Sequence, residues 1–527
     1  MKKKCFHSIL AVFLCCCILV GCSLPDSLPV SMEKSEEDEM LTLGLTPEFT
    51  YEVPESLPNI MVDQVGYAVD SSKVAVFRGE ILPYTYDIID AETGKIVYTG
   101  TIEAKGNAEN SQTGISYGEF TDFTTPGTYY IQADIIGRSF SFVISQNPYE
   151  DIFQAAQKQY YYSRCGFTLS TELAGDAAHN ACHTNLAQLK EDAKVQMDVS
   201  GGWHMDENGN RDVVEGCQAV NSLLLAYELY GNVFSDDIGI PESGNEIPDI
   251  MDEVKYEVDW LLKMQDATSG AVYSTVSVID NQMPSYILYT ENITMDATIQ
   301  FAATMAKFSY LYQNYDRAFA TKCLQAADRA YRYAGKYLED VSAEAYFFAA
   351  AELYRATGNY GYRTVVHDYL NKTQKLDMEN DSVFLGCTTY LDTKQKVDVT
   401  LCEKVIKVLM KEVEDIAYEA KSSAYLTEGN TEQSNNDELL WKMARLTVVD
   451  HIITNHEYAT VLENHIHYFL GRNEQSISYI DGTGSRNYEE IDKKLGIMKQ
   501  IDLNAELVLI MSAIQDELVT EEVSEEK

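Results

Sequence analysis

Residues 247–265 read IPDIMDEVKYEVDWLLKMQ, and this stretch predicts a long helix. Its apolar residues recur at helical spacing. Its acidic residues Asp249, Asp252 and Glu253 gather near the start, where they favour the positive end of the helix dipole. Segments on both sides show the same helical spacing of apolar residues. Many are apolar around more than one face, which suits helices buried between neighbours. Five of them are VNSLLLAYELY, DATIQFAATMAKFSYLY, FATKCLQAADRAYRYAGKYL, AEAYFFAAAELYRATG and LVLIMSAI.

About twelve such segments fit between residues 148 and 515. A closed ring of helical hairpins would bury all of them, although periodicity alone leaves the closure open. Upstream, residues 58–146 have a β-like pattern rich in Val, Ile, Tyr and Phe, with turn signals at Glu92-Thr93-Gly94 and Pro126-Gly127. Strands at this spacing predict a small β-sandwich. The strand segments are KVAVF, TYDIID, IVYTG, YYIQADI and SFSFVI.

The N-terminus has the pattern of an export signal. In residues 1–22, three lysines precede an apolar run that is too short to span a bilayer, and the run ends in Leu19-Val20-Gly21-Cys22. This ending resembles the bacterial lipobox, so we expect Cys22 to carry lipid and to be the only membrane anchor. We therefore expect an exported protein, lipid-anchored at the outer face of a bacterial cell membrane. Residues 23–57, acidic and containing proline, predict an extended tether, and residues 516–527 predict a solvated acidic tail.

Composition excludes some classes of partner. The 527 residues carry 82 Asp and Glu against 40 Lys and Arg, a formal net charge of −42. Nucleic-acid binding requires a basic surface, which this balance argues against, and it also argues against docking on anionic lipid through a basic patch. A neutral ligand such as a carbohydrate is compatible with it. Six cysteines remain after the leader, a low density for a large exported chain, so the core rather than disulfides should stabilise the fold.

Several sequence motifs resemble those of a known family. MVDQVGYAVDSSKVAVF at 61–77 resembles the opening of the immunoglobulin-like domain that precedes many bacterial cellulases of glycoside hydrolase family 9. The rest is similar to that family's catalytic domain, in family order. The resemblance implies an (α/α)6 barrel after an immunoglobulin-like β-sandwich, with a sugar-binding cleft at one barrel end and β-1,4-glucan as the usual substrate. The remaining words are YYYSRCG at 160–166, ACHTNLA at 181–187, which matches the family's early helical region, DVSGGWH at 198–204, the stretch 247–265, AAAELYRATG at 349–358, HYFLGRN at 467–473, SYIDGTG at 478–484 and IDLNAELVL at 501–509.

The two catalytic positions depart from the family pattern. Inverting hydrolysis needs one carboxyl group that protonates the leaving oxygen and another that activates a water. The resemblance places the base in Asp-Ala-Gly-Asp directly after Gly-Gly-Trp-aromatic, where this chain has Met205 and, at the base itself, Asn208. It places the acid at Met498. An amide is no general base and a thioether donates no proton. The His-x-Arg element that the family usually shows after SYIDGTG is also missing, because no His follows His467.

Two interpretations of this departure stay open. In one, the alignment is locally shifted, Asp206 or Glu207 supplies the base, Glu489 or Glu490 supplies the acid, and the chain is an active, diverged endo-β-1,4-glucanase. In the other, family-type hydrolysis is lost and the chain binds β-glucan or a related polysaccharide. A third class of function is a structural or protein-binding lipoprotein that reuses the barrel.

Four side chains suggest a metal site. Cys165, Cys182, His183 and His204 offer two thiolates and two imidazoles, the ligands of a closed tetrahedral zinc site. Relatives of this type carry a structural zinc near the Arg-Cys-Gly and Cys-His words, so the resemblance implies zinc here. A closed site leaves no open position for water, so this zinc would be structural. The sequence assigns no calcium site.

Sugar platforms are the last prediction. Aromatic faces pack well against pyranose rings, and Trp203 and Tyr479 are the candidate substrate-binding residues, with the tyrosines of PSYILYTEN at 284–292 beside them.

Overall fold

The computed structural model describes residues 49–104, 114–282, 285–428, 436–453, 458–488 and 496–525. Apart from Phe49, these residues belong to one compact unit, Thr50–Lys527. The predicted signal peptide, Cys22 and the tether up to residue 48 lie outside the described residues, as do Glu489 and Glu490.

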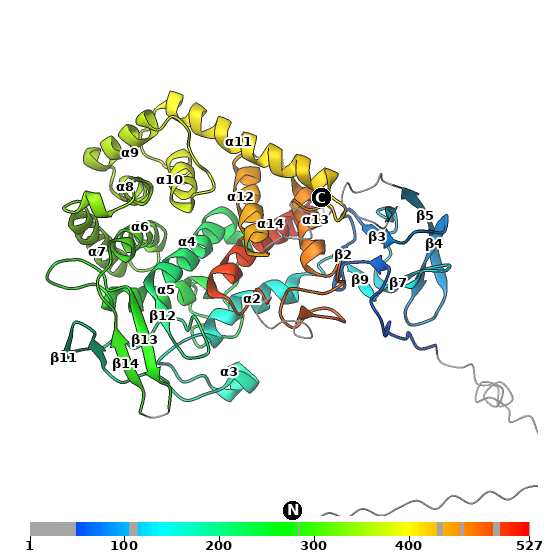
Figure 1. Cartoon of the computed structure of the whole chain (residues 1–527), viewed down its shortest axis with the longest axis horizontal. Coiled ribbons are helices and arrows are strands. Elements are labelled where there is room, and N and C mark those ends of the chain that lie inside the picture. Colours follow the sequence, from blue (N-terminus) through cyan, green and yellow to red (C-terminus); the bar gives the residue numbers. More distant parts are fainter. Residues whose placement is uncertain are drawn as a thin grey trace, which may run out of the picture. The chain divides into compact units, whose positions relative to one another are not determined.

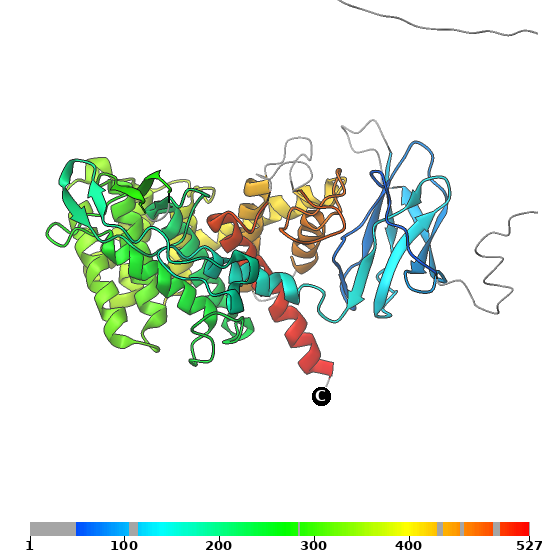
Figure 2. The same ribbon diagram turned by 90° about the horizontal axis from the view of Figure 1, so that it is seen from below.

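A β-sandwich forms the first part of this unit, and Figure 2 shows its two layers. The strands follow the order β1-β3-β6-β5-β4-β7-β9-β2, with β8 paired to β7. β5 links the layers, because its residues up to Thr101 pair with β4 and its last three pair with β6. Five of these strands lie where the sequence predicted them, whereas β1, β2, β6 and β8 were not predicted. The bounds are β1 (Ile60–Met61), β2 (Gly66–Ala68), β3 (Val74–Arg78), β4 (Thr85–Asp90), β5 (Ile96–Ala104), β6 (Ile115–Glu119), β7 (Gly127–Ala133), β8 (Gly137–Arg138) and β9 (Phe142–Ser145).

An (α/α)6 barrel follows the sandwich, as expected. In the described chain, two sets of six long helices alternate along the sequence (Figure 1). The inner helices are α4 (Val213–Tyr230), α6 (Met295–Tyr312), α8 (Ala343–Thr357), α10 (Asp381–Asp392), α12 (Asn436–Ile453) and α14 (Ile501–Glu525). The outer helices are α2 (Glu150–Tyr162), α5 (Asp249–Lys263), α7 (Arg317–Ala334), α9 (Tyr360–Lys372), α11 (Val399–Ser422) and α13 (Ala459–Phe469).

Burial separates the two sets of helices. α8 buries every residue from Ala345 to Arg355 except Tyr346, so it has almost no solvated face, whereas α7 buries mainly the small residues of one stripe. This is the difference expected between a helix enclosed by neighbours and one with a solvated side. α4 packs against both α6 and α14, α8 packs against α6 and α10, and α14 packs against α12. The carboxylate of Asp381 at the start of α10 pairs with Arg445 of α12 at 2.7 Å and completes the ring.

A five-stranded sheet and its loops lie before and between the first inner helices. Its order is β11-β10-β14-β13-β12, and β12 leads directly into α4. The motif ACHTNLA at 181–187, expected in a helical region, instead leads into strand β10. The bounds are β10 (Ala187–Leu189), β11 (Asp192–Met197), β12 (Arg211–Asp212), β13 (Thr275–Asp280) and β14 (Ile287–Thr290).

The C-terminal helix is longer than predicted. α14 continues to Glu525, so most of the segment predicted as an acidic tail is helical. None of the described helices is both long enough and apolar enough to cross a bilayer. Six cysteines of the described chain are free thiols: Cys165, Cys182, Cys217, Cys323, Cys387 and Cys402.

Candidate functional site

The four predicted metal ligands come together in space. One ligand atom from each of Cys165, Cys182, His183 and His204 lies within 4.8 Å of the others. All are buried except His204, which is partly exposed. Two backbone hydrogen bonds bring the Cys165 and His204 segments side by side: the N–H of Cys165 donates to Gly202 O, and that of His204 donates to Ser163 O, both at 2.8 Å.

The donor set fits a metal ion. His183 Nδ1 is buried without a hydrogen-bond partner among the described residues, while His183 Nε2 lies 2.9 Å from Asn281 Oδ1. A hydrogen bond on one ring nitrogen orients a metal-ligating histidine through the other. Hydrogen bonding from Cys165 holds the pKa of the Cys182 thiol well below its usual range, so Cys182 favours the thiolate that binds metal. His204 Nε2 lies 3.4 Å from Cys182 Sγ.

The turn at the family's base position packs against this cluster. Gly209 has φ +84°, and a Cβ there would lie 2.4 Å from His183 Cε1, so only glycine allows this approach. Within the turn, Asp206 accepts hydrogen bonds from the backbone N–H groups of Asn208 and Asn210, both at 3.0 Å, and from Asn210 Nδ2 at 2.6 Å. Although partial burial works against it, hydrogen bonding led by Asn210 keeps the pKa of Asp206 below its usual range. Asp206 therefore holds the turn together, and Asp206, Glu207 and Asn208 are all exposed.

The acid position is apolar. Met498 is buried in the barrel core with 4% of its surface exposed. Its backbone N–H donates to Asp481 Oδ2 at 2.8 Å, which ties the segment before α14 to the SYIDGTG loop. The Met498 thioether has no proton to donate.

The predicted sugar platforms are core residues in this structure. Trp203 is fully buried, with its ring 4.6 Å from that of Tyr160, and Tyr479 is 6% exposed with its ring stacked on Tyr468. A buried ring presents no face to a polysaccharide, so the structure contradicts this role for both. Of the PSYILYTEN tyrosines, Tyr286 packs against His183, with ring centroids 4.2 Å apart.

A pocket of about 340 Å³ opens among the first turns of α4, α10, α12 and α14. Trp441 of α12 lies in it, partly exposed, and its indole Nε1 donates to Asp381 Oδ1 at 2.5 Å. Trp203 and Trp260 are buried, whereas Trp441 lines this pocket. Sequence reasoning missed it, because helical spacing does not distinguish a pocket residue from a core residue. The lining, which we call the mouth pocket, consists of Gln218, Asp381, Asp437, Glu438, Trp441, Asp502, Leu503 and Glu506.

Carboxylates influence one another across this end of the barrel. Burial raises the pKa of Glu506 to about 7, with a further increase from the charge of Asp381, while Ser222 Oγ donates to Glu506 Oε1 at 2.9 Å. Burial also raises the pKa of Glu215, and the charges of Asp212, Asp502 and Asp206 add to it. Asp206 in the turn at the base position and Asp502 at the start of α14 thus both act on the carboxyl group of Glu215. The sequence analysis did not single out Glu506.

Comparisons with known proteins agree with this geometry. Residues 149–500 match Glycosyl hydrolase family 9, and residues 55–138 match the Cellulase N-terminal ig-like domain. Endoglucanase D of Acetivibrio thermocellus is 28% identical over 81% of this chain and 73% of its own length. A cellodextrinase of Butyrivibrio fibrisolvens is 27% identical over 82% of this chain and 86% of its own length. A metagenome-derived family 9 endoglucanase has a crystal structure that superposes with a TM-score of 0.78 at 25% identity, covering 87% of this chain and 98% of its own.

The family match covers the barrel from α2 up to the residue before α14, and the second match covers most of the sandwich before it. The chain therefore belongs to glycosyl hydrolase family 9.

Proposed function

We propose that this chain binds β-glucan or a related polysaccharide at the mouth pocket and has lost hydrolysis by the family's acid/base pair. The observation that carries the proposal is the pairing of an accessible mouth pocket with Asn208 and Met498 at the two catalytic positions. Trp441 is partly exposed in the pocket, with the Arg445 guanidinium over its ring, and Asp437, Asp502 and Gln218 line the pocket with hydrogen-bonding groups. These features support binding, whereas neither catalytic position supplies a carboxyl group.

The test is affinity electrophoresis of the ectodomain in gels with and without soluble β-glucan, paired with an assay of reducing-end release. We expect retarded migration without product, and Trp441→Ala should remove the retardation. Tyr418→Ala is the matched control, because Tyr418 is 76% exposed on the outer helix α11. Absence of both retardation and product would reject the proposal and favour a structural or protein-binding lipoprotein.

An active, diverged glucanase is the second candidate, and Glu506 favours it. A carboxyl group with a pKa of about 7 in a sugar-sized pocket has the protonation behaviour of a general acid at neutral pH. Product release by the wild type that is abolished in Glu506→Gln would support this candidate. The same assay on Asp206→Ala and Glu207→Ala tests the two surrogate bases. Release that survives all three substitutions would exclude these residues as the catalytic groups.

We also propose that the Cys-His cluster holds one structural zinc ion. Two thiolates and two imidazoles complete a tetrahedral shell without a water ligand, and zinc there would cross-link the segments of Cys165, Cys182 and His204. The partnerless Nδ1 of His183 supports the assignment.

The proposed location is the outer face of a bacterial cell membrane, with lipid on Cys22. Labelled fatty acid should be incorporated into the wild type and not into Cys22→Ala. Equal labelling of both proteins would reject the anchor.

A further inference from the structure

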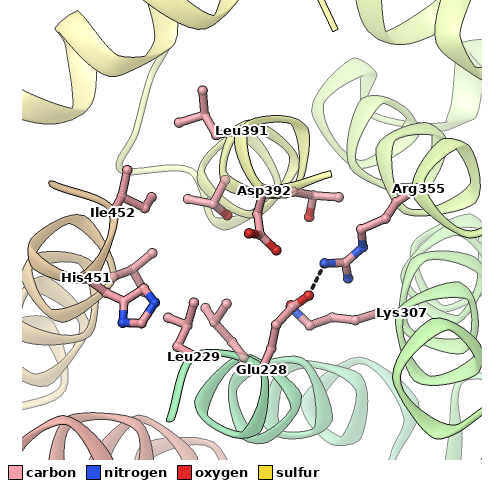
Figure 3. Close-up of a pocket in the computed structure, with 12 residues that line it drawn as sticks. Glu228, Leu229, Lys307, Arg355, Leu391, Asp392, His451 and Ile452 are labelled. Carbon is pink, nitrogen blue, oxygen red and sulfur yellow. Dashed lines mark hydrogen bonds and ion pairs between the residues drawn. The ribbon is translucent and has the colours of Figure 1, made fainter. Parts of the chain in front are cut away.

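A second cavity, of about 300 Å³, lies inside the barrel (Figure 3). Side chains of five inner helices line it: Leu225, Glu228 and Leu229 of α4, Lys307 of α6, Arg355 of α8, Thr388, Thr389, Leu391 and Asp392 of α10, and Val448, His451 and Ile452 of α12. We call it the far cavity.

The far cavity and the mouth pocket lie toward opposite ends of the same helices. On α4 the mouth pocket takes Gln218 and the far cavity reaches Leu229, and at a rise of ~1.5 Å per residue these positions are roughly 16 Å apart. On α12 the order is the same, from Asp437 to Ile452. A cavity of only about 50 Å³ lies between them; it shares Leu225 with the far cavity and Gln218, Asp381 and Glu506 with the mouth pocket. The far cavity and the mouth pocket themselves have no lining residue in common.

Buried charges form the base of the far cavity. Lys307 is 1% exposed and Arg355 is 2% exposed. Arg355 NH1 donates to Glu228 Oε1 at 2.5 Å, and Lys307 Nζ lies 3.6 Å from Glu228 Oε2. Arg355 NH2 also lies 2.6 Å from Glu352 Oε2, so two cations face two anions. Removing four charges from water has a large desolvation cost, and well-packed apolar residues would serve stability as well or better.

Hydrogen-bond donors and acceptors remain in the far cavity after these ion pairs are counted. Arg355 Nε has no hydrogen-bond partner among the described residues, although it is buried. The ammonium of Lys307 carries three donors, of which the long contact with Glu228 uses at most one. Figure 3 shows Asp392 directed toward the Arg355 and Glu228 side chains from the opposite wall. Thr388 Oγ1 donates to Leu385 O at 3.0 Å and keeps acceptor capacity. The cavity thus offers donors on one wall and acceptors on the other.

The charge balance selects the class of ligand. The two buried cations pair with Glu228 and Glu352, and Asp392 adds a third carboxyl group, whose pKa is raised by burial and by the charge of Glu228, so the cavity holds no surplus positive charge for an anion. Hydroxyl groups both donate and accept, which suits the facing donors and acceptors, and the side walls of Leu225, Leu229 and Val448 suit C–H surfaces. The volume lies at the lower end of the ~300–1,000 Å³ that small-molecule sites occupy.

We propose that the far cavity binds a neutral, polyhydroxylated molecule of monosaccharide size. This site is independent of polysaccharide binding at the mouth pocket, and it would stand if that function failed.

The test is saturation-transfer NMR and thermal-shift titration of the ectodomain. The probes are D-glucose, D-xylose and myo-inositol as neutral polyols, inorganic phosphate as an anion, and glycine as a zwitterion. We expect saturable binding of at least one polyol. Asp392→Ala, which removes an exposed acceptor at the rim, should weaken this binding at least tenfold. Leu229→Trp, which fills the cavity from a partly buried position, should abolish it. Trp441→Ala in the mouth pocket is the control and should bind the polyol like the wild type.

Three results would overturn the proposal. One is that no polyol binds to a wild type that melts cooperatively. Another is that phosphate or glycine binds in place of the polyols. The third is polyol binding that Trp441→Ala removes and that Asp392→Ala and Leu229→Trp leave unchanged, since this would place the sugar in the mouth pocket. The variants avoid Lys307 and Arg355, because breaking their buried ion pairs could unfold the barrel.

Discussion

Cys182 is the residue on which the metal cluster depends most. Its sulfur lies within reach of Cys165, His183 and His204, so its loss leaves only three ligands. We predict that Cys182→Ser loses about one equivalent of zinc per chain in metal analysis. Because metal binding in such a site is coupled to folding, the melting temperature should fall as well. Cys402→Ser is the matched control, since Cys402 is a free thiol on α11 outside the cluster, and it should keep its metal. If the wild type contains no zinc after purification from cells grown in zinc-supplemented medium, the site is disproved.

Asn281 acts on the same cluster through one hydrogen bond. Its Oδ1 accepts from His183 Nε2, which leaves Nδ1 directed at the cluster. Removal of such a partner typically weakens metal affinity by about 10–100-fold. We predict that Asn281→Ala shifts zinc competition with a chromogenic chelator by this factor. Asn281→Asp keeps the acceptor and should stay close to the wild type. An unchanged chelator midpoint in Asn281→Ala would mean that packing alone orients His183.

At the scale of elements, the start of α10 joins two inner helices. Asp381 Oδ1 accepts from Trp441 Nε1 and from Arg445 NH2, both on α12. Hydrogen bonds to a charged group contribute about 1.5–3 kcal/mol, and the Asp381 side chain is about half exposed, which reduces this. We predict that Asp381→Ala lowers the free energy of unfolding by about 1–2 kcal/mol in urea titration and also weakens glucan retardation, because Trp441 loses its anchor. Asp437→Ala, in the same pocket, should leave stability close to the wild type. Equal losses in the two variants would show that Asp381 does not act through Trp441.

The sequence predicts features that depend on neighbouring residues better than features that depend on contacts between distant segments. The helices and five strands follow from local periodicity, whereas the Cys-His cluster was predicted from ligand type and order together with the family resemblance. The fates of Trp203 and Trp441 depend on how distant segments pack. Trp203 lies on a loop that pairs with Arg164 just after α2, and its backbone N–H donates to the buried Glu257 at 2.7 Å, which holds this segment in the core. Trp441 is left at a pocket only because the ring of inner helices closes around it, and periodicity does not encode that closure.

At the scale of the whole molecule, the excess of acid affects stability through the few carboxylates that the barrel encloses. Most of the 82 acidic residues can lie on solvated surfaces. Asp252, Glu257 and Glu506 differ, because burial raises their pKa values to about 6, 8 and 7. The barrel therefore holds protons that the unfolded chain releases near pH 4–5, so these groups stabilise the folded state most in acid and lose that contribution as pH rises.

The predicted consequence is a melting temperature that falls between pH 5 and pH 8. Glu506 should contribute up to about 3 kcal/mol of this loss, because its pKa in the folded state is about 7 against an ordinary 4.5. Glu506→Gln keeps an acceptor for Ser222 and carries no charge, so it should flatten the decline and be more stable than the wild type at pH 8. Differential scanning calorimetry at half-unit steps of pH measures both effects. Glu207→Gln, which changes an exposed carboxylate, should follow the wild-type curve. A Glu506→Gln curve parallel to the wild type across this range would mean that Glu506 is already ionised in the folded barrel. The mouth pocket would then hold one more permanent negative charge, and Glu506 could not act as a proton donor.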